Sequence, residues 1–227
     1  MRFLKFLLAL ILLPTVFFVC VETGRILLSV LGHFRTVLAF VAGAGVYAAV
    51  HYTLYDFSRP YVLVHEFTHA LVAFLFGVHV KDISIKRESG YVKMDKTNVF
   101  IVLAPYVIPG YTLLTLFLYC VGDLFVDLTP YRTVFLFFIG FFTSFHFIQT
   151  VITLLEADQP DLKLAGGKIF SLVLIILANL IVLALVLKGL FPEQVSLLSA
   201  AENVLKSTLN TWRILVNYIV AHTIEAL

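Results

Sequence analysis

Long apolar stretches separated by short polar segments dominate the hydrophobic pattern of this chain. A helix that crosses a lipid bilayer needs about 20 mainly apolar residues in succession. The stretches that approach this length cover residues 3–21, 36–55, 60–76, 99–121, 133–155 and 169–190. The pattern therefore predicts an all-α polytopic membrane protein with about six transmembrane helices. We interpret the first stretch as a retained span, because it is long for a signal-peptide core and has no small-residue cleavage site after it.

The fourth stretch contains residues that disfavour a continuous helix, namely Pro105, Pro109 and Gly110. Non-helical backbone at membrane depth is tolerated where protein or a water-filled cavity surrounds it. We therefore expect this stretch to kink or to unwind locally. It either faces the inside of the helical bundle or is a tolerated proline kink.

The segment from residue 78 to residue 96 has a different pattern. Val78 and Val80 are spaced by two residues, as are Ile83 and Ile85, and a turn-forming Glu88-Ser89-Gly90 follows. Alternation with a period of two is typical of strands, so the pattern predicts a short β-hairpin at a membrane surface. An irregular loop is the alternative.

The C-terminal segment, residues 197–219, repeats apolar residues at steps of three and four, with polar residues on the other side. This periodicity predicts an amphipathic helix. The helix lies on the bilayer or packs against the bundle or against a second copy. The expected organisation is an integral membrane domain over residues 1–190 and an amphipathic C-terminal helix over residues 191–227.

Composition agrees with this class of protein. Hydrophobic residues make up 61% of the chain and charged residues 13%, whereas a soluble domain has about 45–50% and about 25%. The net charge is +2, and no basic run exceeds Lys86-Arg87, which argues against nucleic-acid binding. Cys20 and Cys120 lie apart in apolar runs, so they predict no paired cysteine site. We expect a multi-pass protein of the cell membrane, surrounded by the lipid bilayer.

The third stretch carries the residues with the clearest chemistry, His65-Glu66-Phe67-Thr68-His69. Two histidines four residues apart share one helix face, so both imidazoles can bind one Zn²⁺ at about 2.0–2.1 Å. Glu66 is rotated by roughly 100° and can act as a general base on a water at the metal without binding the metal itself. The alternative is a polar patch inside the bundle. Each ionisable residue at membrane depth costs a few kcal/mol, which favours a functional role.

A catalytic zinc site usually has three protein ligands and one open position. Pro160 follows the fifth stretch and breaks a helix there, which allows a neighbouring aspartate to turn back towards the histidines. His146 and Gln149 share a helix face in the fifth stretch. They are expected to support the ligands, to hold a substrate carbonyl or to bridge two helices. From the residues alone, the candidates for the third ligand are Asp158, Asp161, His146, His51 and His79.

His65-Glu66-x-x-His69 and the later Gln159-Pro160-Asp161, with hydrophobic stretches around both, resemble the site-2 protease family of intramembrane zinc metalloproteases. That family carries His-Glu-x-x-His on one transmembrane helix and an Asn-Pro-Asp-Gly-like element on another, whose aspartate is the third ligand. The resemblance implies that His65, His69 and Asp161 bind zinc. It also implies that Glu66 activates water.

The chain departs from the family pattern at several positions, and therefore resembles the small, divergent members. Gln159 stands in place of Asn, and Leu162 in place of Gly. Ala104-Pro105-Tyr106 replaces the Gly-Pro-x-x-x-Asn element.

The resemblance implies a zinc metalloendopeptidase that hydrolyses peptide bonds of membrane-embedded or membrane-proximal protein substrates, with Zn²⁺ as cofactor. It also implies that the hairpin offers an edge strand to an extended substrate. The alternative from another class is a non-catalytic zinc-binding membrane scaffold or chaperone. Glu66 argues against this alternative, because a structural zinc site needs no base. A transporter is disfavoured by the absence of repeat symmetry, and a zinc hydrolase of another type would take a glutamate such as Glu156 as third ligand.

Overall fold

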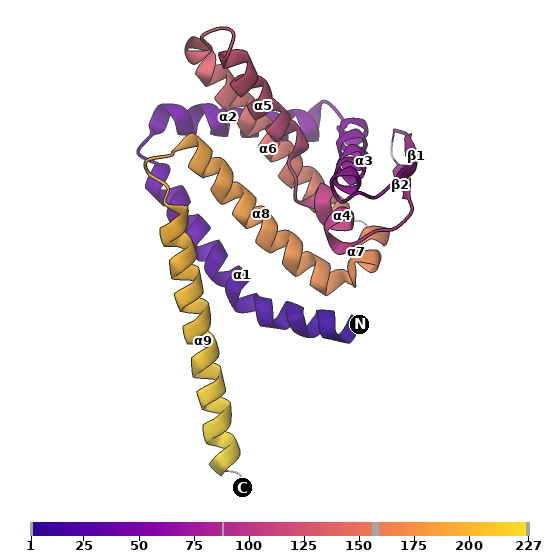
Figure 1. Cartoon of the computed structure of the whole chain (residues 1–227). Coiled ribbons are helices and arrows are strands. Elements are labelled where there is room, and N and C mark those ends of the chain that lie inside the picture. The colour runs from indigo at the N-terminus through magenta and orange to yellow at the C-terminus, as the bar shows by residue number, and fades with distance from the viewer. Residues whose placement is uncertain (1, 88, 156–158, 226–227) are drawn as a thin grey trace. The chain divides into compact units, whose positions relative to one another are not determined.

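The structure, a computed structural model, describes residues 2–87, 89–155 and 159–225, and consists of helices and one two-stranded sheet (Figure 1). The chain divides into two compact units, one formed by residues 1–32 with 172–227 and the other by residues 33–171. The predicted fold class is confirmed: a helical membrane protein with a short hairpin and a C-terminal helix.

The unit formed by residues 33–171 contains most of the elements. In chain order they are α2 (Phe34–Thr53), α3 (Ser58–Leu75), β1 (Val80–Ile85), β2 (Gly90–Met94), α4 (Val99–Leu103), the 3₁₀ helix η1 (Ala104–Tyr106), α5 (Gly110–Asp123), the 3₁₀ helix η2 (Thr129–Tyr131), α6 (Arg132–Leu155) and α7 (Pro160–Ala165). Helix α8 (Lys168–Leu190) begins in this unit and continues into the other.

The other unit pairs the first and last helices of the chain, α1 (Arg2–Val30) and α9 (Leu197–Glu225). Between them, the buried carboxylate of Glu22 accepts a hydrogen bond from the Asn203 side chain at 3.4 Å and pairs with Arg25 on its own helix. Many apolar side chains of α9, such as Leu205 and Leu209, remain exposed. The helix predicted for the C-terminal segment is therefore present, and part of it packs against α1.

Two glycines bring α2 and α6 into close contact. A Cβ atom on Gly43 would overlap the backbone carbonyl of Phe137, and a Cβ atom on Gly140 would overlap that of Phe40. Small residues allow helix backbones to approach in this way in membranes. Gly43 therefore allows close helix contact, whereas a Cβ atom on Gly45 would have nothing within 4 Å.

The fourth apolar stretch is broken, as its prolines and glycine predict. Helix α4 ends at Leu103, the turn η1 follows, and α5 begins at Gly110 after a bend of 78°. The carbonyl of Ala104 accepts hydrogen bonds from the amides of Val107 and Ile108 at 3.0 and 2.8 Å, which fixes the turn. The Tyr111 hydroxyl donates to the Pro60 carbonyl at 3.0 Å and so ties α5 to α3.

The predicted hairpin is also present, as β1 and β2 in antiparallel register from Val80 opposite Met94 to Ile85 opposite Gly90. Its inner side packs on α3 and α4, where Val80 and Met94 contact a cluster of buried residues. That cluster consists of Val72, Ala73, Val78, Ile101 and Ala104.

The hairpin also carries two exposed polar pairs. Asp95 pairs with Lys81, and the hydrogen bond from this ammonium lowers the pKa of the Asp95 carboxyl. The Tyr91 hydroxyl donates to the Asp82 carboxylate at 2.7 Å. This hydrogen bond, together with the negative charge of Asp82, raises the pKa of Tyr91. Exposed pairs of this kind stabilise a fold only slightly. The position of the hairpin therefore depends on its apolar inner side.

Four helical segments are long and apolar enough to cross a membrane, or five if α4, η1 and α5 together form one broken span. The four cover residues 3–30, 34–53, 129–155 and 168–190, within the residues that the structure describes. The predicted count of six is not confirmed, because α3 is not among them. Arg59 and the polar residues of the His-Glu-x-x-His signature make α3 less apolar than the four candidate spans.

Candidate metal centre

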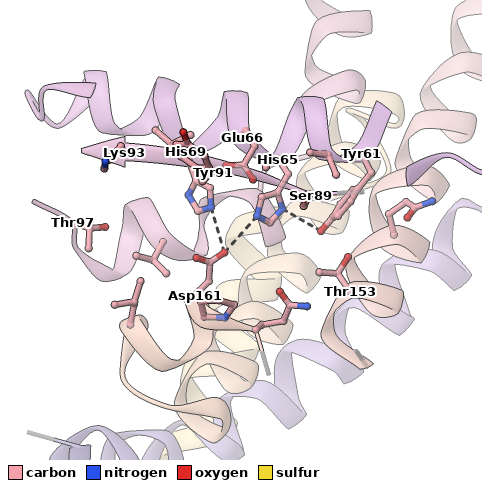
Figure 2. Close-up of a pocket in the computed structure, with 18 of the residues that line it drawn as sticks. Tyr61, His65, Glu66, His69, Ser89, Tyr91, Lys93, Thr97, Thr153 and Asp161 are labelled. Atoms are coloured by element: carbon pink, nitrogen blue, oxygen red, sulfur yellow. Dashed lines mark hydrogen bonds and ion pairs between the residues drawn. The ribbon is translucent and has the colours of Figure 1, made fainter. Parts of the chain in front are cut away.

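Three potential metal ligands from distant parts of the chain meet beside α3. His65 and His69 lie one helical turn apart on α3, and Asp161 lies in the first turn of α7. The Oδ2 atom of Asp161 is 3.5 Å from Nε2 of His65 and 3.4 Å from Nε2 of His69 (Figure 2). The ligand atoms of the three residues lie within 4.8 Å of one another. No other group of this kind occurs among the residues that the structure describes.

Neighbouring groups orient both imidazoles towards this point. Nδ1 of His69 lies 2.8 Å from the carbonyl oxygen of Ile101. Because a carbonyl only accepts hydrogen bonds, Nδ1 carries the proton and Nε2 keeps its lone pair for a metal. Nδ1 of His65 lies 3.3 Å from the Tyr61 hydroxyl, which likewise leaves Nε2 facing Asp161. Histidines that bind metals have a second hydrogen bond of this type, so the donor set fits zinc.

Asp161 reaches the histidines because α7 starts directly before it. Pro160 occupies the first turn of α7, where a missing amide proton costs nothing. The helix is anchored by Leu162 and Ala165, which are buried, and by the Ser171 hydroxyl, which donates to the Leu162 carbonyl at 3.2 Å. In addition, the Tyr106 hydroxyl donates to Oδ2 of Asp161 at 3.0 Å.

Glu66 is buried and lies directly beneath the start of β2. A Cβ atom on Gly90 would come within 2.5 Å of Cγ and 2.7 Å of Oε1 of Glu66. The hairpin backbone therefore covers this carboxylate without a side chain between them. Glu66 is not part of the three-ligand group, although it is adjacent to His65 in the sequence.

A cavity of about 630 Å³ opens over the three ligands and Glu66 (Figure 2). Every residue of β2, from Gly90 to Met94, lines it, and no residue of β1 does. The opposite wall includes Gln149 and Thr153 of α6, and Tyr61 of α3. The hairpin and α6 therefore both line the cavity, together with the three candidate ligands His65, His69 and Asp161.

The other residues singled out in the sequence occupy different places. His51 stacks on Tyr47 at 5.6 Å between ring centroids, and His79 lies in solvent 3.8 Å from Asp95. His146 is buried on α6 and does not line the cavity. None of these histidines joins His65 and His69 in the ligand group. Asp158 and Glu156 lie outside the described residues.

Gln149 differs from its neighbour His146, because it does line the cavity. Its side-chain amide donates to the Tyr47 hydroxyl at 3.0 Å and so links α6 to α2. Both residues are buried. The bridging of two helices, one of the roles considered for Gln149, is therefore observed.

Sequence reasoning assigned no role at the centre to Tyr106 or Gly90, although Tyr106 contacts Asp161 and Gly90 lies against Glu66. The position of Tyr106 could have pointed to it, because Ala104-Pro105-Tyr106 stands where the site-2 protease family has its Gly-Pro-x-x-x-Asn element. The contact between Gly90 and Glu66 could not be inferred from the sequence, because an ordinary turn also favours a glycine after Glu88-Ser89.

Comparison with known proteins bears on the family of the chain. A family described as peptidase M50B-like matches residues 37–157, which is more than half of the 227 residues. The matched segment includes His65, Glu66 and His69 and ends before Asp161. No curated protein and no solved structure matches the chain. The chain belongs to the peptidase M50B-like family of membrane-embedded metalloproteases, and is thus a member of the site-2 protease family.

Proposed function

We propose that this protein is an intramembrane zinc metalloprotease of the cell membrane, which hydrolyses peptide bonds of membrane-embedded or membrane-proximal protein substrates. The observation that carries the proposal is the convergence of His65, His69 and Asp161 within 4.8 Å, beside a buried Glu66, in an M50B-like chain. A non-catalytic zinc scaffold would need the three ligands but not the carboxylate.

In the proposed mechanism, His65, His69 and Asp161 would hold a zinc ion beside the cavity that they line. A zinc ion bound there would supply a Lewis acid for the scissile carbonyl and would lower the pKa of a water towards about 7. Glu66 accepts the proton of that water and transfers it to the leaving amine. The hairpin backbone over Glu66 limits the number of positions that its carboxylate can take, which keeps the base aimed at the cavity.

The substrate must present an extended segment to the centre, because a helix hides its peptide bonds. Strand β2 supports this arrangement, since all its residues line the cavity and, among the residues that the structure describes, β1 is its one partner strand. The other edge can pair with an extended substrate by β-strand addition. We further propose that residues 1–190 form the membrane domain and residues 191–227 an amphipathic appendage.

The test uses the full chain purified in detergent, with bound zinc and cleavage of single-span membrane proteins as the measurements. Glu66→Gln should keep zinc and lose cleavage by at least about 10²-fold, because it removes the base but no ligand. The matched control is Glu22→Gln, which changes a buried carboxylate in the other unit and should cleave normally. Unchanged cleavage by Glu66→Gln would refute the mechanism, and zinc binding without cleavage of any substrate would favour the scaffold.

A second comparison tests the third ligand. Asp161→Ala should reduce zinc occupancy far more than Asp158→Ala, because Asp161 faces both histidines. The reverse result would assign the ligand to Asp158.

A further inference from the structure

The carboxylate of Asp161 needs more than its backbone to stay in place. Helix α7 has six residues and is held by the burial of Leu162 and Ala165. These contacts fix the helix but leave the two side-chain torsions of Asp161 free to change rotamer. A metal ligand is effective only when neighbouring groups restrict it to the binding geometry.

Tyr106 supplies such a restriction. It is fully buried, and its hydroxyl lies 3.0 Å from Oδ2 of Asp161, the same oxygen that faces Nε2 of His65 and of His69. Because an ionised carboxylate only accepts hydrogen bonds, the Tyr106 hydroxyl donates. The tyrosine ring also stands edge-on to the His65 ring, at 5.1 Å between centroids and 89° between planes. One side chain therefore contacts ligands from both α3 and α7.

The backbone around Tyr106 is well suited to hold this side chain. Pro105 sits in the first turn of η1 with a fixed φ angle, and the Ala104 carbonyl accepts two amide hydrogen bonds. In the same short segment, the carbonyl of Ile101 accepts a hydrogen bond from Nδ1–H of His69. Residues 99–106 thus orient His69 through a backbone carbonyl and Asp161 through a hydroxyl.

We propose that Tyr106 is the positioning residue for Asp161, holding its carboxylate in the geometry that binds the metal. This inference rests on the proposed function, because it assumes that Asp161 is a zinc ligand. Tyr106 neither binds the metal nor touches the reacting atoms. It acts through Asp161. In this chain Ala104-Pro105-Tyr106 replaces the Gly-Pro-x-x-x-Asn element, so no asparagine of that element is present.

The test compares Tyr106→Phe with the wild-type protein in a zinc-binding titration against a competing chelator. Removing the hydroxyl should weaken zinc binding about 10- to 100-fold, as is typical when the hydrogen-bond partner of a ligand is lost. The visible spectrum of the Co²⁺-loaded protein should change as well, because it reports the ligand geometry. Tyr111→Phe is the matched control, since it removes a hydroxyl that donates to the Pro60 carbonyl instead. It should leave affinity and spectrum unchanged.

A double variant separates positioning from packing. If Tyr106 acts through Asp161, Tyr106→Phe should have no further effect on zinc affinity in the Asp161→Ala background. A Tyr106→Phe protein with wild-type affinity and spectrum would overturn the inference and leave the proposed function intact. Equal losses in Tyr106→Phe and Tyr111→Phe would overturn it too, because they would indicate a general packing effect. A wild-type protein that binds no zinc would refute the proposed function itself.

Discussion

Gly90→Ala perturbs the proposed base without touching a metal ligand. Gly90 begins β2 and faces the Glu66 side chain, and its φ is not positive, so an alanine meets no backbone strain there. The added Cβ atom would lie 2.5 Å from Cγ of Glu66, whereas ordinary contacts begin at 3.4 Å. Either the carboxylate or the strand must therefore move by about 1 Å.

A displacement of this size has a large expected effect on catalysis. A misplacement of about 1 Å of a reacting group lowers the rate by about 10²-fold. We therefore expect kcat to fall by about one to two orders of magnitude, while zinc content stays at the wild-type level. The assay is cleavage of a single-span substrate under saturating conditions, with bound metal measured on the same sample.

The control for this substitution is Gly45→Ala, because nothing lies within 4 Å of a Cβ atom at that position of α2. It should leave both kcat and zinc content unchanged. Wild-type kcat in Gly90→Ala would show that the hairpin does not restrain Glu66. A parallel loss of zinc would show that the hairpin supports the ligands instead.

Two further predictions concern the contact between α2 and α6. Gly140→Ala should destabilise the protein by about 1–3 kcal/mol, because the new Cβ atom meets the Phe40 backbone, which cannot rotate away. A melting temperature in detergent equal to that of wild type would contradict this. Tyr47→Phe should cost about 1–3 kcal/mol, since it leaves the buried Gln149 amide without its acceptor. Its zinc content should remain unchanged, and loss of zinc would mean that this hydrogen bond supports the centre.

Local patterns predicted the elements of this fold well. The alternation of apolar residues from Val78 to Ile85 predicted the hairpin, and the structure confirms it. This element was predictable because its pattern involves neighbouring residues alone. The prolines of the fourth stretch predicted the break before α5 for the same reason. The count of spans was less accurate, since α3 has the length of a span but carries the polar residues of the centre.

The sequence predicted the part of the site that depends on residue spacing along a single helix. The pairing of His65 and His69 follows from one helical turn, whereas the place of Asp161 depends on how α7 folds back, which no local pattern encodes. Neither the hydroxyl of Tyr106 nor the close approach of Gly90 leaves a periodic signal, because each contact joins residues far apart in the chain. Such contacts depend on how distant segments pack together, which the structure shows and the sequence pattern does not.

The covering of Glu66 by a glycine backbone has a consequence for how this enzyme family can diversify. Gly90 approaches the carboxylate with its backbone and has no side chain of its own, so this contact restricts the residue type at position 90. Tyr91 and Lys93 line the cavity and are exposed, which leaves them free to change with the substrate. If the proposed function holds, substitutions at these two positions can alter which sequences are cleaved, while the contact between Gly90 and the proposed base Glu66 stays unchanged.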